Sequence, residues 1–451
     1  MKREIIVKTP VGITDEFTVN NIVQQGSVSG TALCVASIGE ITQEDLGGGC
    51  QIGSTNIKAL SFVDDIATAC RNPRNTYTSH RNVEWFSDRK RLSLNGPKCV
   101  HLNVNTKVTD VIPRLKIGDT VLKNVDCATY LGDQFNTAGT NKDLIEERVK
   151  KGKCCMVNAM SLCSEITMGM YTIQTLLLLY KGMFLQVVLF DAQAWSNLTD
   201  SNIKDLQTVQ LKYLKRMLHA PASTSNSATF LETGTLPIEH EIHVKQFTFL
   251  HHIITLDSND PVKTTYHQQL KYPYEANWGN GMIKLKAKYG IVESDDDIAK
   301  MKKEKWKTMI KAKVKEHVLQ DLKRKASNQK WASNLTLPSK LYKQDYLVML
   351  PSENARKIFH IRSGTVDLKC YRRYKYGEDR LCRLCNEEDE NVEHVVNNCP
   401  SVSRQYRIDD IFTQNIDDLL EISKRCILFD QLAEEMDELE NEMRCEQSQN
   451  G

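Results

Sequence analysis

The 451-residue sequence lacks any uninterrupted apolar run of the about 18 to 20 residues that a membrane-spanning helix requires. Its most apolar stretch, 176–190, is interrupted by Lys181, Gly182 and Gln186 and predicts a buried helix. The first residues contain no apolar core with a cleavage site, so we expect neither a secretory signal nor a membrane partner. An excess of one charge is also missing, because 59 Lys and Arg stand against 57 Asp and Glu. This balance excludes a uniformly basic nucleic-acid coat.

Disulfide spacing, fixed-period repeats and low-complexity tracts are missing as well. The 14 cysteines are spread along the whole chain, which is typical of reduced thiols rather than a disulfide framework. We therefore expect an intracellular protein made of ordinary globular domains. The sequence does not distinguish a nuclear from a cytoplasmic location, and it leaves the oligomeric state open.

Two kinds of pattern divide the chain. Residues 1–135 combine short β-branched runs with turn residues, and they predict hairpins over 3–23 and 108–122. From Asn141 onward apolar residues recur at helical spacing. This spacing predicts helices from residue 141 and over 170–195, 201–219 and 238–256. The fold class we expect is α+β.

The remaining segments differ in composition. Prolines and glycines at intervals over 257–295 predict an irregular connector. Residues 300–330 hold 12 Lys and Arg but three acids, and residues 434–442 are strongly acidic. The acidic segment predicts a frayed helical tail.

An acidic pair, Asp64-Asp65, follows the apolar residues Phe62 and Val63. Apolar β-formers on both sides predict a strand–turn–strand in which the turn projects two carboxylates. Carboxylate oxygens suit Mg²⁺, and a pair of such ions can hold both oxygens of a phosphoryl displacement. Two acids in a turn are also common on ordinary surfaces, so the pair alone leaves both interpretations open.

A second constellation lies near the C-terminal end of the chain. Cys382, Cys385, His394 and Cys399 follow the pattern C-x2-C-x8-H-x4-C. Three thiolates and an imidazole can close a tetrahedral Zn²⁺ site, and four protein ligands leave no open position. The pattern therefore predicts a structural zinc ion that orders a polar segment, rather than a catalytic one.

Basic residues gather in two places. Arg362, Arg372, Arg373, Lys375 and Arg380 alternate with tyrosines just before the cysteine pattern. Basic and aromatic side chains together suit single-stranded nucleic acid. Residues 300–330 would likewise suit phosphates. For both segments a solvated basic surface is the equally simple alternative.

Several motifs surround the acidic pair in a fixed order. Gln24-Gln25-Gly26-Ser27 precedes it, and the segment 92–98, Leu-Ser-Leu-Asn-Gly-Pro-Lys, follows it. Tyr130-Leu131-Gly132 comes next. This order resembles the reverse transcriptase of non-LTR (LINE-like) retrotransposons, in which a Gln-Gly-Ser motif, an F-x-D-D box, an L-x-L-N-x-x-K segment and a Y-L-G strand follow one another. The resemblance covers most of 4–256 and 355–405, and the zinc pattern resembles that family's C-terminal knuckle.

The resemblance assigns roles to individual residues. Asp64 and Asp65 match the catalytic carboxylates that bind Mg²⁺ or Mn²⁺. Gln25 and Gly26 match the turn that borders the template and the incoming nucleotide. Lys98 matches a lysine near the phosphates, while Tyr130 and Gly132 lie on the strand that grips the primer end. The implied partners are an RNA template and a DNA primer, or other nucleic acid.

The chain also departs from the family. A third carboxylate is expected several tens of residues before the Gln-Gly motif, but only 23 residues precede Gln24. Their acids are Glu4, Asp15 and Glu16, none of which has the expected position. The fingers and the first part of the palm have no counterpart, and Val28-Ser29-Gly30-Thr31 replaces a Ser-Pro continuation. Without these parts the metals lack a ligand and nothing closes on the nucleotide.

The expected architecture has five parts: a partial palm (1–135), a helical thumb and following region (136–256), a connector with a basic helix (257–360), a zinc knuckle (361–405) and an acidic helical tail (406–451). The expected function is that of a retrotransposon-derived RNA-directed DNA polymerase, truncated and inactive as this chain. The alternative is a nucleic-acid-binding remnant that uses the basic helix and the zinc knuckle. The sequence leaves open whether the chain is an enzyme.

Overall fold

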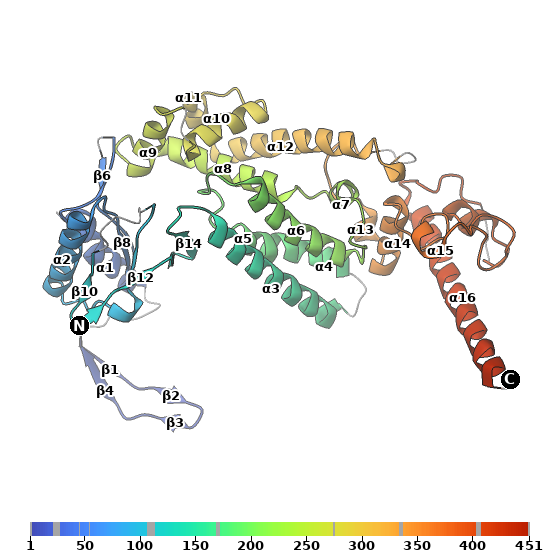
Figure 1. The fold of residues 1–451 in the computed structure, drawn as a ribbon, viewed down its shortest axis with the longest axis horizontal. Coiled ribbons are helices and arrows are strands. Elements are labelled where there is room, and N and C mark those ends of the chain that lie inside the picture. The colour runs from blue at the N-terminus through green and yellow to red at the C-terminus, as the bar shows by residue number, and fades with distance from the viewer. Residues whose placement is uncertain are drawn as a thin grey trace. The chain divides into compact units, whose positions relative to one another are not determined.

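The computed structural model describes residues 2–20, 28–44, 46–53, 55–105, 113–167, 172–273, 276–332, 337–402 and 407–449. The chain divides into two compact units, drawn in Figure 1. The N-terminal unit comprises Met1–Leu144 and Leu256–Glu275, and the helical unit comprises Ile145–Thr255 and Ala276–Gly451. The combination of helices and small sheets confirms the expected α+β class.

The described strands all lie in the N-terminal unit, and each sheet there has two strands. The antiparallel pairs are β1 (Lys2–Ile5) with β4 (Phe17–Asn20), β2 (Lys8–Thr9) with β3 (Gly12–Ile13), β5 (Cys50–Ile52) with β6 (Thr55–Ile57), β7 (Ala59–Phe62) with β8 (Asp65–Thr68), β10 (Lys116–Ile117) with β11 (Thr120–Val121), and β13 (Cys127–Tyr130) with β14 (Asp133–Asn136). The parallel pair is β12 (Lys123–Val125) with β9 (Val100–Leu102). No continuous palm sheet forms within the described residues.

Both predicted hairpins form where the chain is described. In the first, β1 pairs with β4 and the β2–β3 turn closes the tip. In the second, β10 and β11 flank Gly118, which adopts φ +52°, a left-handed value that glycine reaches without a Cβ clash. Residues 108–112 of that hairpin lie outside the described residues.

Helices complete the N-terminal unit. They are α1 (Val28–Gly39), η1 (Glu40–Thr42), α2 (Pro73–Arg89), η2 (Gly96–Lys98) and α9 (Pro261–Leu270). Asn72 caps α2, because its side chain accepts a hydrogen bond from the backbone N–H of Asn75 at 2.8 Å. A small core of Ile41, Leu46, Ala59 and Phe86 holds η1, β7 and α2 together.

The helical unit is built almost entirely from α-helices. They are α3 (Lys142–Thr167, which begins in the N-terminal unit), α4 (Thr172–Leu179), the π-helical turn η3 (Tyr180–Phe184), α5 (Leu185–Val188), α6 (Asp200–Met217), α7 (Asn226–Thr233), α8 (Ile238–Thr255), α10 (Trp278–Lys288), α11 (Asp295–Lys300), α12 (Lys303–Ala326), η4 (Lys330–Ala332), α13 (Tyr346–Met349), α14 (Ser352–Arg362), α15 (Arg373–Tyr376), the π-helical turn η5 (His394–Asn398) and α16 (Ile416–Gln449). The helices predicted after residue 141 are therefore confirmed.

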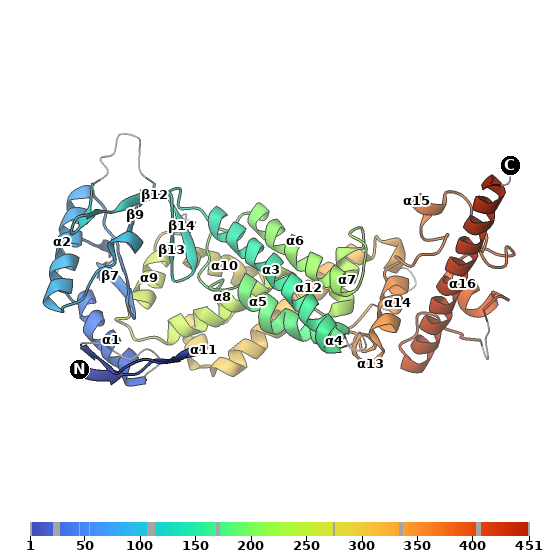
Figure 2. The same ribbon diagram turned by 90° about the horizontal axis from the view of Figure 1, so that it is seen from below.

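The basic helix α12 packs lengthwise on α8 (Figure 2). Its buried side chains recur every four residues from Trp306 to Ala326, so one stripe faces the core while the lysines face outward. Trp306 is fully buried, and its indole N–H donates to the carbonyl oxygen of Phe247 at 2.8 Å. This bond fixes the register between the two helices.

The prediction of an irregular connector over 257–295 is wrong. This stretch forms α9 and α10, with α11 beginning at its end. Some of the proline and glycine signals mark helix ends, since Pro261 occupies the first turn of α9 behind the N-cap Asp260, whereas Gly279 and Gly281 lie within α10. Gly290 has φ +60° just after α10.

The acidic tail is one long helix, α16, which continues to Gln449. Its first half is anchored by apolar residues, because Leu419, Ile422, Phe429 and Ala433 are buried. Across the described parts of the chain, no helix combines the length and apolar character that crossing a membrane demands.

Candidate functional site

The two aspartates lie at the tip of the β7–β8 hairpin. Phe62 pairs with Asp65, so Val63 and Asp64 form the two-residue turn. Asp64 and Asp65 are both exposed. The predicted strand–turn–strand that projects two carboxylates is thus present.

Val63 adopts φ +57° in this turn. A left-handed conformation is costly for a β-branched residue, and glycine or asparagine would be the ordinary choice. Strained turns of this kind occur at sites where a side chain must be held in a set direction. Here the strained residue immediately precedes the acidic pair.

Tyr130 approaches the same hairpin from β13. Its hydroxyl donates to the carbonyl oxygen of Leu60 on β7 at 3.4 Å. Burial raises the pKa of Tyr130, and the negative charge of Asp65 raises it further. Tyr130 therefore lies close to the acidic pair. Gly132 follows in the β13–β14 turn with φ +88°, a value that favours glycine.

For the other residues predicted for this site, no contact with the acidic pair is described. Lys98 is exposed in the short turn η2. Gln25 and Gly26 lie outside the described residues. Among the described His, Cys, Asp and Glu side chains, one group alone brings three or more ligand atoms together, and it is the cysteine cluster. No described third acid therefore joins Asp64 and Asp65, and magnesium binding here stays a prediction.

The four predicted zinc ligands converge. Cys382, Cys385, His394 and Cys399 place their ligand atoms within 4.8 Å of one another. The Sγ atoms of Cys382 and Cys399 are 3.8 Å apart, and Cys385 Sγ is 3.3 Å from His394 Nε2. Zn–S bonds of about 2.3 Å at tetrahedral angles give an S···S distance of about 3.8 Å. The cluster can therefore hold a metal ion, and its donors fit structural zinc.

The imidazole of His394 is oriented for such an ion. Its Nδ1 lies 2.9 Å from Glu388 Oε2. Because the carboxylate accepts the Nδ1 proton, Nε2 is left with a lone pair toward the three sulfurs. Burial raises the pKa of the Cys382 thiol to about 12. Without a cation, this thiol therefore keeps its proton at neutral pH.

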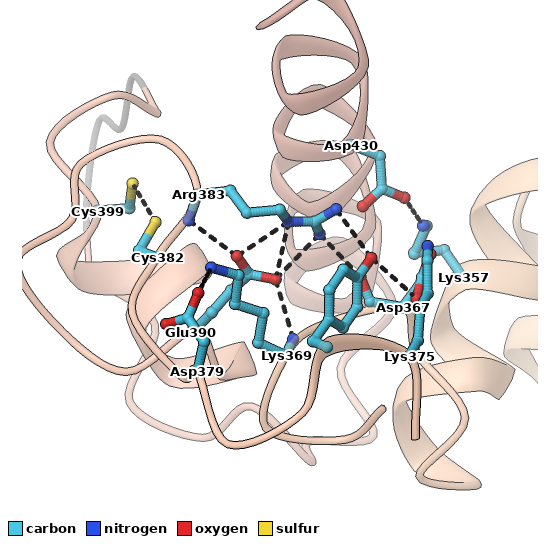
Figure 3. A network of polar contacts seen from close by, with 11 residues as sticks. Lys357, Asp367, Lys369, Lys375, Asp379, Cys382, Arg383, Glu390, Cys399 and Asp430 are labelled. Carbon is cyan, nitrogen blue, oxygen red and sulfur yellow. Dashed lines mark hydrogen bonds and ion pairs between the residues drawn. The ribbon is translucent and has the colours of Figure 1, made fainter. Parts of the chain in front are cut away.

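A polar network joins the cluster to the segment before it, as Figure 3 shows. Glu390 is fully buried and accepts from the guanidinium of Arg383 and from the backbone N–H of Lys369 at 3.0 Å. Arg383 also donates to the hydroxyl of Tyr376 at 3.1 Å and to the carbonyl oxygen of Asp367 at 3.0 Å. The cysteine–histidine cluster and residues 367–383 therefore form one structural module. Glu388 and Glu390 are not among the residues predicted for this site, and the run of acids between the ligands is the one signal in the sequence that indicates them.

The basic–aromatic stretch before the cluster is partly buried. Arg362 is buried against Glu232, with Nε 3.0 Å from Oε2. Arg372 is buried and donates to the carbonyl oxygen of Thr365. These two cations stabilise the fold locally, because buried charges must be paired. The side chains of Lys375 and Arg380 are accessible to solvent, so nucleic-acid binding by this stretch stays a prediction. Tyr374 is exposed, and nothing is described for the Arg373 side chain.

The exposed lysines of α12 belong to a larger lysine cluster. Four of its members, Lys181, Lys245, Lys311 and Lys315, lie around Glu241 of α8. Lys307 and the carboxylate of Asp191 lie near Lys245, so the five lysines come from three elements. Burial raises the pKa of Glu241, although Lys311, Lys181, Lys315 and Lys245 oppose the shift. Burial lowers the pKa of Lys245. The five lysines of this surface therefore outnumber the two acids, Glu241 and Asp191, that act on them.

Comparisons with known proteins add no family assignment. No protein-family model and no curated protein matches the chain.

Proposed function

We propose that this chain is a reverse-transcriptase-derived protein that binds single-stranded nucleic acid without extending a primer. The observation that supports nucleic-acid binding is the lysine cluster around Glu241. Three elements contribute to it, and two carboxylates, Glu241 and Asp191, cannot balance the five lysines Lys181, Lys245, Lys307, Lys311 and Lys315. Such a surface attracts phosphates and releases their counterions.

The surroundings of Asp64 and Asp65 support the other part of the proposal, that the chain does not extend a primer. Phosphoryl transfer depends on metals held by several carboxylates at once. Within the described residues Asp64 and Asp65 have no third acidic partner. Two exposed acids alone would leave a metal ion mostly hydrated and poorly positioned.

Binding is tested by measuring the affinity of the full chain for a single-stranded RNA at several salt concentrations. We expect the triple change Lys307→Gln, Lys311→Gln, Lys315→Gln to weaken binding about tenfold and to lower the salt slope by about 0.7 for each lost phosphate contact. The matched control removes three exposed lysines elsewhere, through Lys150→Gln, Lys153→Gln and Lys424→Gln. Equal losses in both variants would show that the lysine cluster is not the binding surface.

RNA-directed DNA synthesis is the second candidate, favoured by the strained turn that exposes Asp64 and Asp65 beside Tyr130. The test is primer extension on a primed RNA template with Mg²⁺ or Mn²⁺, beside the double change Asp64→Ala, Asp65→Ala. We expect no extension by either protein and unchanged RNA affinity in the double variant. Extension that disappears in the double variant would establish a polymerase instead.

A further inference from the structure

The helical unit contains a groove that neither the acidic turn nor the lysine cluster explains. It has a volume of about 900 Å³ and is lined by α6, the segment after it, and side chains from α3, α4 and α14. This volume is at the upper end of the about 300–1,000 Å³ typical of ligand sites.

All charged side chains lining the groove are basic. They are Lys212, Lys215, Arg216 and Arg356, and the imidazole of His219 lies beside them. No aspartate or glutamate is found among the described lining residues. Glu353 lies near Arg356, but one carboxylate does not balance four cations. The excess of cations in a hollow raises the local positive potential, because the low-dielectric walls focus the field.

Two of the cations are held firmly in the walls. Lys215 Nζ donates to the carbonyl oxygens of Ala222 at 2.8 Å and Thr224 at 2.6 Å. Arg356 Nε donates to the carbonyl oxygen of Met217 at 3.2 Å. Burial lowers the pKa of both side chains, so the protein pays a desolvation cost to keep these charges there.

Helix capping explains only part of this arrangement. Cations near the end of α6 would complement its C-terminal carbonyls, as Arg356 does at Met217. However, Lys212 and Arg216 are exposed on the groove side of α6. Burial and the charge of Arg356 also lower the pKa of His219. Capping alone would not require several cations that repel one another.

The groove lining also has an apolar part, which we call the floor, and the basic residues make up the part that we call the rim. The apolar part consists of the aliphatic and thioether side chains of Met160, Leu176, Leu211, Ala220 and Ala222. A ligand that fits both surfaces has anionic groups for the rim and flat apolar faces for the floor. Nucleotides of a single strand have both, whereas a duplex hides its base faces.

We propose that the groove beside α6 binds a short stretch of single-stranded nucleic acid, with phosphates on the cationic rim and bases on the apolar floor. The choice of ligand rests on the proposed function. The site itself is separate from the lysine cluster, and the two can be tested independently.

The experiment uses the full chain and an eight-residue oligonucleotide of 4-thiouridine. Ultraviolet cross-linking followed by peptide mass spectrometry reports where the bases lie. We expect adducts within 208–222 and on the peptide that contains Arg356. The double change Lys212→Gln, Arg216→Gln should lower their yield at least fivefold, because both side chains are exposed and contribute to the rim. Lys150→Gln, Lys153→Gln should leave the yield unchanged, and thermal melting checks that both variants are folded.

The outcomes separate the two proposals. RNA binding that depends on the lysine cluster, with no groove adducts, would overturn the groove site and leave the proposed function intact. Groove adducts that persist when the triple lysine variant also keeps its full affinity would support the groove and overturn the lysine cluster. No binding of either RNA would overturn both. Displacement of the oligonucleotide by a fatty-acid anion at lower concentration than by unlabelled oligonucleotide would overturn the ligand class.

Discussion

Serine at Cys382 and Cys385 is expected to abolish zinc binding and to unfold the module around the cluster. Structural zinc sites contribute about 10 to 16 kcal/mol of apparent binding free energy at neutral pH, which a short polar segment cannot replace. Two of the four converging ligands would be lost. Elemental analysis should find one zinc ion per native chain and none in the variant.

The loss of order should extend beyond the cysteines, because the network in Figure 3 depends on the loop between them. Cys382 donates its backbone N–H to the carbonyl oxygen of Glu388 at 2.8 Å, and Glu390 binds Arg383 and Lys369. Arg425 of α16 donates to the carbonyl oxygen of Val396 at 2.9 Å. Hydrogen exchange should therefore accelerate over 365–402 and in the first half of α16.

The matched control is Cys154→Ser, which changes an exposed thiol on α3 in the same unit. It should retain zinc and the native exchange pattern. Glu388→Gln should retain zinc with about 10- to 100-fold lower affinity, because the partner that orients His394 is weakened. A native chain that contains no zinc and keeps its exchange pattern in a chelator would contradict the zinc assignment.

The convergence of the three cysteines and His394 shows what sequence spacing can predict. Four ligands within 18 residues must lie near one another, so the pattern alone identifies them. The acidic hairpin was predictable for the same reason, since strand and turn signals are local. The helices after residue 141 also follow from a periodic pattern within each segment.

Features that depend on distant contacts could not be predicted. Arg362 in sequence resembles the solvent-accessible Lys375 and Arg380 after it, yet it pairs with Glu232, 130 positions away. Lys311 and Lys315 belong to a cluster only because α12 packs on α8 and brings them to Glu241. The groove beside α6 likewise requires Arg356 from α14. A sequence pattern within one segment cannot predict contacts between segments that are far apart in the chain.

The second large effect that we expect is a loss of stability when the Arg362–Glu232 pair is broken. Both side chains are buried, at 3% and 5% exposure. Tyr346 also donates its hydroxyl to Glu232 Oε2 at 2.9 Å, and its ring lies 5.9 Å from the Arg362 guanidinium. Burial opposes the charge of Arg362, but Glu232 raises the pKa of Arg362 above its usual value. Each charge is therefore tolerated only because the other is present.

Arg362→Met should lower the free energy of unfolding by about 3 to 5 kcal/mol, because it leaves Glu232 charged and unpaired in the interior. The triple change Arg362→Met, Glu232→Met, Tyr346→Phe should recover most of that loss, since no buried polar group then lacks a partner. Urea unfolding measures both. The control Arg324→Met removes an exposed arginine that pairs with Asp321, and it should cost about 0.5 kcal/mol or less. If the triple variant were as unstable as the single one, the loss would come from packing and not from an unpaired charge.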